Sequence, residues 1–344
     1  MLRRLRLLAG FLLVALILGC QQEKIIGAIH LSGQTMGTTW SVAMLPKPDG
    51  TNTAALQLLL QKRLDKINSL MSTYDPMSEI SRFNKRISTD WFAISDETAQ
   101  VIELSLTISH LTGGAFDVSV GPLVELWGFG ATERGKKIPT EDRINKILAR
   151  VGYENIRLQR QPAAISKQIP ELRIDLSAIA KGYAVDALAT LLEQQGISNY
   201  LVEIGGELKI SGHRSGGGPW QIAIEKPLED TREVATIFPL TDIALATSGN
   251  YRNFYIEDGQ RYAHTLDPVS GKPIRHKLAS VTVLDQSCAR ADALATALMV
   301  LGEEKGRQLC ETHQIAAYFL IHDQASTVVY ASPTFQKFVE EVIQ

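Results

Sequence analysis

The sequence predicts an α+β fold in which mixed or antiparallel sheets pack against helices. Helical periodicity dominates residues 53–196, whereas strand patterns are concentrated in residues 200–330. Asp258-Gly259 separates two of these strand patterns, and this dipeptide strongly favours a hairpin with antiparallel strands. No repeat, low-complexity tract or obvious linker divides the chain.

The first half is expected to form scaffold helices. Each has apolar residues at helical spacing and a polar or glycine signal at one end. These helices are expected at residues 53–70, 95–111 and 140–151. A glycine-containing turn leads into a strand at residues 34–42, and a polar loop is expected at residues 78–84.

The second half is expected to form the sheet. Its strands are predicted at residues 200–204, 207–211, 220–225, 237–246, 252–257, 260–266, 279–284, 315–322 and 327–330. A helix at residues 290–301 has Ala, Leu or Met on nearly every face, which predicts that it is buried. A terminal helix is expected at residues 335–343.

The central stretch is Asp175 to Asp186, which reads DLSAIAKGYAVD. It joins a short β-like run to a helix expected to begin at Ser177, whose side chain would accept from the first free backbone N–H groups, and to end near Gly196. A carboxylate therefore lies beside a helix start, which carries partial positive charge, and Lys181 follows about one turn later. These groups suit an anion and a metal ion, although the same arrangement is also common as a plain N-cap.

The N-terminus has the pattern of an export signal. A basic start precedes an apolar run from Leu7 to Leu18, which is too short to span a bilayer comfortably. The letters ILGC at residues 17–20 resemble a bacterial lipobox, in which cleavage precedes a cysteine that becomes lipidated. The alternative is a plain signal peptide in which Cys20 is incidental. The predicted organisation is a lipoprotein signal peptide at 1–19, a lipid-anchored tether at 20–32 and a folded domain at 33–344.

Charge and cysteine content exclude some functions. The formal net charge of −2 gives no reason to expect a nucleic-acid or polyanionic partner. Cys288 and Cys310 lie in or beside apolar segments, so we expect two free, buried thiols rather than a disulfide. No Cys or Cys/His spacing typical of zinc appears.

Asp292 and Thr296 are polar residues four apart in the apolar helix, so both point to one side of it. A buried carboxylate without a partner is costly, which favours a cation beside it. Mg²⁺ takes oxygen ligands and usually needs only one or two protein carboxylates. The alternative is an ion pair between Asp292 and Arg290.

Other polar and aromatic features are less specific. Residues 115–122 and 126–130 place small residues, aromatic residues and the Asp117 carboxylate together, which suits either a flat ligand or a tight turn packed on the core. His264 is expected on a strand, and residues 247–252 form a polar run suited to a nucleotide or to a turn. The residues alone therefore indicate a candidate Mg²⁺–phosphate site and an aromatic-lined pocket.

Eight motifs follow one another along the chain. They are TMGTTW at 35–40, MSTY at 71–74, GGAFDVSVGPL at 113–123, DLSAIAKGYAVD at 175–186, EIGGEL at 203–208, TSGNYRNFY at 247–255, AHTLDPVSGKP at 263–273 and ADALATAL at 291–298. In this order they resemble the ApbE family, the FAD:protein FMN transferases of the bacterial cell envelope. Any one motif is weak, but eight in register are highly specific.

The resemblance implies the residues of the site. Those expected to contact FAD are Met36, Tyr74, Ala115, Phe116, Asp117, Asp175, Lys181 and His264, and those matching metal positions are Ala178, Asp292 and Thr296. Ala178 has no side-chain ligand, so it would contribute its backbone carbonyl oxygen. The fold implied is the family's mixed α+β architecture with T-fold-like sheets.

The resemblance also implies a reaction. With Mg²⁺, FAD would be split, FMN would be joined through its phosphate to a Thr or Ser hydroxyl of a target protein, and AMP would be released. His264 is the candidate general base, because the unperturbed pKa of histidine lies near neutrality, and Asp175 is the alternative. Two other functions fit the same residues: an FAD pyrophosphatase giving FMN and AMP, and a non-catalytic flavin-binding lipoprotein.

The expected partners are flavin-accepting subunits of membrane redox complexes. A lipid anchor at Cys20 would hold the enzyme beside them, on the periplasmic side of the cell membrane. Gln21 after the cysteine would permit sorting to an outer membrane, so the choice between inner and outer membrane stays open.

Overall fold

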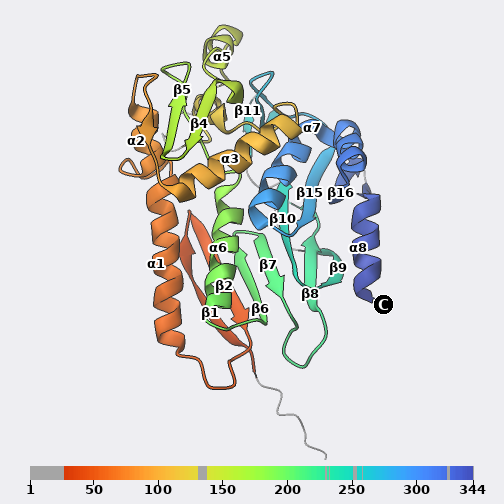
Figure 1. Cartoon of the computed structure of the whole chain (residues 1–344). Helices are drawn as coiled ribbons and strands as arrows, with labels where there is room; N and C mark the ends of the chain where they lie inside the picture. The colour runs from red at the N-terminus through yellow and green to blue at the C-terminus, as the bar shows by residue number, and fades with distance from the viewer. Residues whose placement is uncertain are drawn as a thin grey trace, which may run out of the picture.

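The computed structural model describes residues 27–130, 138–228, 231, 233–250, 254–257, 259–323 and 326–343. Its centre is an antiparallel sheet of eight strands in the order β1-β2-β6-β7-β10-β15-β16-β17 (Figure 1). Smaller sheets and helices surround it, so the predicted α+β class with antiparallel sheets is confirmed.

The central sheet combines strands from both ends of the chain. Its members are β1 (Ile29–Thr35), β2 (Thr38–Met44), β6 (Tyr200–Ile204), β7 (Glu207–Ser211), β10 (Ile243–Gly249), β15 (Leu278–Asp285), β16 (Ala316–Asp323) and β17 (Ser326–Ala331). Alternate residues of a strand face opposite sides of a sheet. Trp40 and Val42 of β2 accordingly enter the main core, whereas Ala43 packs against the core on the other face.

Helices cover one face of this sheet and enclose the main core. They are α1 (Thr53–Met71), α3 (Asp96–Leu111), α6 (Ala180–Gln194) and α7 (Cys288–His313), and Figure 1 shows α6 and α7 lying across the middle strands. α7 is interrupted at Gly302, whose φ is 76°. Both Cys288 and Cys310 are free and buried in this layer, as predicted.

The opposite face carries a smaller core. A hairpin of β8 (Trp220–Glu225) and β9 (Val234–Leu240) packs there with the terminal helix α8 (Pro333–Ile343). Phe238, Tyr318 and Phe335 meet in this core, with ring centroids 5.2–5.5 Å apart.

The remaining elements lie toward the top of the molecule in Figure 1. They are α2 (Glu79–Lys85), the three-stranded sheet β3-β5-β4 (Phe92–Ala93, Ala163–Lys167, Ile156–Arg160), α4 (Gly121–Leu126), α5 (Glu141–Leu148), the hairpin β11-β12 (Phe254–Glu257, Gln260–Ala263), the pair β13-β14 (Leu266–Asp267, Lys272–Pro273) and the short 3₁₀ turns at Val118–Val120 and Tyr153–Asn155. A third core of aromatic and aliphatic residues joins α4 and α5 to the β11-β12 hairpin.

The predicted helices at 53–70, 95–111 and 140–151 are confirmed, and each begins at a polar cap. Asn52, Ser95 and Thr140 accept hydrogen bonds from backbone N–H groups of the first turn. None of the helices in the described part of the chain has both the length and the apolar character needed to cross a bilayer. The predicted signal peptide and Cys20 lie outside the described residues.

Three expected boundaries are wrong. Strand β1 begins at Ile29, because its backbone pairs with β2 from Ile29 onward, so residues 29–32 of the predicted tether belong to the sheet. The expected loop at 78–84 is helix α2, which Ser78 caps. The single strand expected at 237–246 is two strands, because Asp242 has a φ of 49° and turns the chain between β9 and β10.

Two expectations near the site are also wrong. Helix α6 begins at Ala180 rather than at Ser177, and its N-cap makes no side-chain hydrogen bond. The hydroxyl and N–H of Ser177 both donate to Asp175 Oδ1, and residues 176–180 form a turn in which the Ile179 and Ala180 N–H groups donate to the Leu176 carbonyl. His264 lies in the bend between β12 and β13, not on a strand.

Candidate active site

A cavity of about 410 Å³ opens beside the first turns of α6 and α7. Ten of the eleven residues expected to bind FAD or metal line it: Tyr74, Ala115, Phe116, Asp117, Asp175, Ala178, Lys181, His264, Asp292 and Thr296. Met36 is the exception. It lies in the β1–β2 turn with a φ of 49° and packs against the main core.

The segment that enters α6 is held by its neighbours. The Asn84 side chain of α2 donates to the Ile174 carbonyl and accepts from the Ile174 N–H, both at 2.7 Å. The Asp175 N–H donates to the Val118 carbonyl at 2.7 Å. The Asp175 carboxylate is thereby fixed at the cavity wall, where it accepts from Ser177.

The turn before α6, at residues 177–179, leaves one backbone oxygen without a hydrogen-bond partner in the part of the chain that the structure describes. In a regular helix the Gly182 N–H would donate to the Ala178 carbonyl, but here it donates to Asp292 Oδ2 at 3.0 Å. Among the described residues no hydrogen bond reaches the Ala178 carbonyl. Ala178 lines the cavity, so this oxygen is available to a ligand.

Lys181 lies between two buried carboxylates. Its Nζ is 2.8 Å from Glu207 Oε2 and 3.8 Å from Asp292 Oδ1, and both acidic side chains are only 4 % exposed. Burial works to lower the pKa of Lys181, but the two carboxylates outweigh it and the pKa is raised, so the amine is protonated. Burial raises the pKa of Glu207 and of Asp292, and Lys181 opposes this rise in each.

The second polar residue of α7 faces the same cavity. Thr296 Oγ1 lies 3.2 Å from Ser248 Oγ of β10, and both residues line the cavity. The alternative partner considered for Asp292 is wrong, because Arg290 pairs with Asp285 at 3.2 Å. Asp292 instead faces Lys181 and the Gly182 N–H.

Asp117 supports the cavity wall through its own hydrogen bonds. One carboxylate oxygen accepts from the Ser119 N–H and hydroxyl at 2.7 and 2.6 Å, and the other accepts from the Tyr153 N–H at 2.9 Å. Burial raises the pKa of Asp117, although these donors oppose the rise. The carboxylate thus fixes the loop, and residues 115–117 line the cavity.

Aromatic groups form the outer part of the cavity. The His264 ring meets the edge of Phe129, with centroids 6.3 Å apart. Tyr74 also lines the cavity, and burial followed by the charge of Asp175 raises the pKa of its hydroxyl. This arrangement suits a flat ring system near the opening and charged groups deeper inside.

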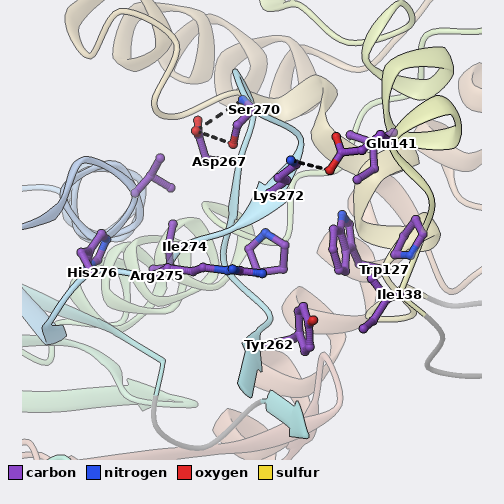
Figure 2. Close-up of a pocket in the computed structure, with 14 residues that line it drawn as sticks. Trp127, Ile138, Glu141, Tyr262, Asp267, Ser270, Lys272, Ile274, Arg275 and His276 are labelled. Carbon is purple, nitrogen blue, oxygen red and sulfur yellow. Dashed lines mark hydrogen bonds and ion pairs between the residues drawn. The ribbon is translucent and has the colours of Figure 1, made fainter. Parts of the chain in front are cut away.

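A second cavity of about 500 Å³ lies across the segment that contains β13 and β14 (Figure 2). Trp127 and Tyr262 stack beside it, and Lys272 pairs with Glu141 at 2.7 Å. None of the residues predicted for the site lines it. The first cavity, with its buried charges, is therefore the candidate site.

The donor atoms of the first cavity fit one kind of metal. In the described part of the chain, no group of three or more His, Cys, Asp or Glu side chains could hold an ion. The Ala178 carbonyl, the Asp292 carboxylate and the Thr296 hydroxyl instead offer oxygen atoms with a single carboxylate. This set suits Mg²⁺, which leaves several positions to water or substrate phosphate.

Sequence reasoning missed three residues that build this site. Glu207 holds Lys181, Gly182 donates to Asp292, and Asp186 accepts from Ser287 Oγ and the Ala289 N–H at the start of α7. Gly182 and Asp186 lie in the central stretch and Glu207 in EIGGEL, so their motifs were found without their roles. These contacts join segments that are far apart in the sequence, so no local sequence pattern predicts them.

A comparison with known proteins gives the class of protein to which this sheet, helices α6 and α7 and the oxygen-lined cavity belong. The ApbE family model matches residues 36–319, and the chain belongs to the ApbE family. It is 45 % identical over 334 residues to the FAD:protein FMN transferase of Vibrio cholerae, covering 97 % of this chain and 98 % of that one. It is 38 % identical over 344 residues to the Escherichia coli protein of the same name, covering 98 % and 97 %.

Solved structures agree with these sequence matches. The flavin transferase ApbE from Vibrio cholerae superposes with a TM-score of 0.85 at 45 % identity, covering 90 % of this chain and 99 % of that one. The apo flavinyl transferase ApbE from Pseudomonas stutzeri gives a TM-score of 0.83 at 37 % identity, covering 91 % and 96 %.

Proposed function

We propose that this protein is an FAD:protein FMN transferase that requires Mg²⁺. The hydroxyl oxygen of a Thr or Ser in the acceptor protein would bond to the phosphorus of the FMN half of FAD. The pyrophosphate bond to that phosphorus would break, AMP would leave with the bridging oxygen, and the hydroxyl proton would pass to a base on the enzyme. Membership in the ApbE family supports this assignment.

One observation carries the metal part of the proposal. The Gly182 N–H donates to Asp292, the Ala178 carbonyl accepts no hydrogen bond among the described residues, and Ala178 lines the same cavity as Asp292 and Thr296. These three residues would hold Mg²⁺. The ion, when bound, would neutralise charge on the phosphates of FAD.

The other cavity residues would bind and orient FAD. The backbone of residues 115–117 and the Tyr74 ring suit the flat part of the molecule, and Lys181 supplies a positive charge at depth. Phosphoryl transfer depends mainly on positioning and charge neutralisation, and these groups provide both. His264 is the candidate base, with Asp175 as the alternative, because both line the cavity.

The location of the enzyme is part of the proposal. We infer that residues 1–19 are removed and that Cys20 carries a lipid, which would keep the domain at the membrane surface on the periplasmic side. The acceptors would be flavin-carrying subunits of membrane redox complexes in the same compartment.

Mass spectrometry of the acceptor tests the activity. The protein from Gln21 onward would be incubated with FAD, Mg²⁺ and a candidate acceptor domain, with EDTA in a parallel sample. A mass gain of one esterified FMN that EDTA abolishes is expected. AMP and free FMN without any gain would indicate a pyrophosphatase, and intact FAD with every acceptor tried would leave a binding protein.

A further inference from the structure

The carboxylates and the amine around Asp292 form a buried cluster with unequal distances. Lys181 Nζ lies 2.8 Å from Glu207 Oε2 but 3.8 Å from Asp292 Oδ1. The ammonium is therefore ion-paired with both carboxylates and lies closer to Glu207, whose Oε2 accepts no hydrogen bond among the described residues. Asp292 Oδ2 accepts from the Gly182 N–H, whereas Oδ1 accepts no backbone hydrogen bond in the described part of the chain and is therefore the oxygen more open to a metal ion.

Glu207 is placed to hold the ammonium in this position. It is the first residue of β7, on the face of the sheet that α6 and α7 cover, and the residue is 3 % exposed. Thr38 and the Lys181 stem pack against Gly205 in the preceding turn, where a Cβ would lie 2.9 Å from Thr38 Cγ2 and 3.5 Å from Lys181 Cδ. The strand and the lysine stem are therefore packed closely together.

The charges favour a further cation. Two carboxylates and one ammonium leave an excess negative charge when all three groups are ionised, and a buried charge of this kind is costly unless it is compensated. If Glu207 lost its charge, the ammonium would have only Asp292 as an anionic partner in the cluster. It would then move toward Oδ1 and compete with the metal ion for that oxygen.

We propose that Glu207 is a positioning residue of the metal site, which holds the Lys181 ammonium away from Asp292 Oδ1 and so keeps that oxygen available to a divalent cation. This inference rests on the proposed metal site but concerns a residue that would not touch the metal. Groups that orient a metal ligand from outside the coordination shell typically change metal affinity about 10- to 100-fold when removed.

Direct Mn²⁺ binding tests the inference without using transferase activity. The full-length protein in detergent would be titrated with Mn²⁺ in the absence of FAD, and the electron paramagnetic resonance signal of free Mn²⁺ would report binding. Glu207→Gln is expected to weaken binding by about tenfold or more. Lys181→Met, which removes the competing ammonium, is expected to bind at least as tightly as wild type.

The double variant separates positioning from a general structural effect. Glu207→Gln with Lys181→Met is expected to recover the affinity of Lys181→Met alone, because the displaced ammonium is gone. Glu203→Gln is the matched control. It removes a carboxylate from the same hairpin, but Glu203 lies on β6 facing the other side of the sheet and bonds to Ser41 and the Gly206 N–H. Its Mn²⁺ affinity is expected to equal that of wild type.

Several results would overturn the inference. Unchanged affinity in Glu207→Gln would do so, and so would a folded double variant that stays as weak as Glu207→Gln. If Glu207→Gln does not fold, Lys181→Met decides alone, and weaker binding in that variant contradicts a competing ammonium. Wild-type protein that binds Mn²⁺ neither alone nor in the presence of FAD would instead refute the metal in the proposed function, which is a distinct outcome.

Discussion

Gly182→Ala tests whether close contact between α6 and α7 sets the geometry of the site. A Cβ at Gly182 would lie 2.3 Å from the Cys288 carbonyl oxygen, 2.6 Å from its carbon and 2.8 Å from Ala289 Cα. All three are backbone atoms in the first turn of α7, so no side chain can rotate to make room. The turn would have to move, and with it the acceptor of the Gly182 N–H, Asp292.

Two opposing effects determine the expected magnitude. Replacing Gly by Ala inside a helix stabilises it by about 1 kcal/mol when nothing else changes. Overpacking a core typically costs about 1–3 kcal/mol, and three backbone overlaps place this site near the upper value. The free energy of unfolding is therefore expected to fall by about 2 kcal/mol, although helix propensity alone predicts a rise.

Urea unfolding followed by circular dichroism measures this difference on the protein from Gln21 onward. Thr190→Ala is the control, because Thr190 is exposed on the same helix: it gains up to about 0.7 kcal/mol of helix propensity and loses only an exposed hydroxyl bond to the Asp186 carbonyl. Mn²⁺ affinity is expected to fall together with stability in Gly182→Ala and to stay unchanged in Thr190→Ala. A Gly182→Ala protein as stable as wild type would refute the close contact.

Three further predictions concern charge. Asp292→Asn keeps an acceptor for Gly182 but loses the charge, so Mg²⁺-dependent transfer should fall at least about a hundredfold by mass spectrometry; wild-type transfer would contradict the assignment. Burial lowers the pKa of Lys167 from 10.5 to about 8, and the positive charge of Arg173 contributes to the same shift. Because the unfolded chain then binds this proton more strongly than the folded protein, the free energy of unfolding of the wild type should rise by about 2 kcal/mol from pH 8 to 10.5. The rise should be smaller in Lys167→Met, and an equal dependence on pH in the two proteins would contradict the lowered pKa. His264→Gln should lower kcat for transfer about 10²- to 10⁴-fold with FAD binding retained, whereas an unchanged kcat would favour Asp175 as the base.

Local signals in the sequence predicted the scaffold well. Helix α1 follows directly from its apolar spacing, since Leu56, Leu60 and Leu64 are all buried. The same local reasoning failed at Ser177, because a serine before an apolar run normally caps a helix. Here the Ile179 and Ala180 N–H groups donate to the Leu176 carbonyl in a separate turn, while Ser177 donates to Asp175, and the helix starts at Ala180 instead.

The residues of the candidate site were predicted mainly from the order of motifs, because no single one is decisive. The contacts among them were not predictable, since each depends on how strands and helices pair over long distances. Lys181 meets Glu207 only because β7 lies beneath α6, and Asp292 meets Gly182 only because α7 crosses α6. Periodicity gives the buried face of a helix but not the partner that covers it.

The crossing of α6 and α7 leads to a last prediction, at a residue outside the cavity lining. Asp186 lies one turn after Gly182, and its Oδ2 accepts from Ser287 Oγ at 2.9 Å and from the Ala289 N–H at 3.1 Å. It thus caps α7 from the side of α6, while its Oδ1 binds Lys209 at 3.0 Å. Because Asp292 and Thr296 follow within two turns, the position of this cap sets where both side chains meet the Ala178 carbonyl.

Asp186→Ala should therefore weaken Mn²⁺ binding about tenfold, although the residue touches neither metal nor FAD. Loss of a cap should also lower stability by about 1 kcal/mol. Lys209→Met is the control, since it removes the ion pair with Asp186 and a hydrogen bond to the Gln286 carbonyl but leaves the contacts of Asp186 with Ser287 and Ala289 in place, so its Mn²⁺ affinity should be that of wild type. If Asp186→Ala lost stability but bound Mn²⁺ normally, the helix crossing would serve the fold alone, and the metal-site geometry would have to come from the loop that enters α6.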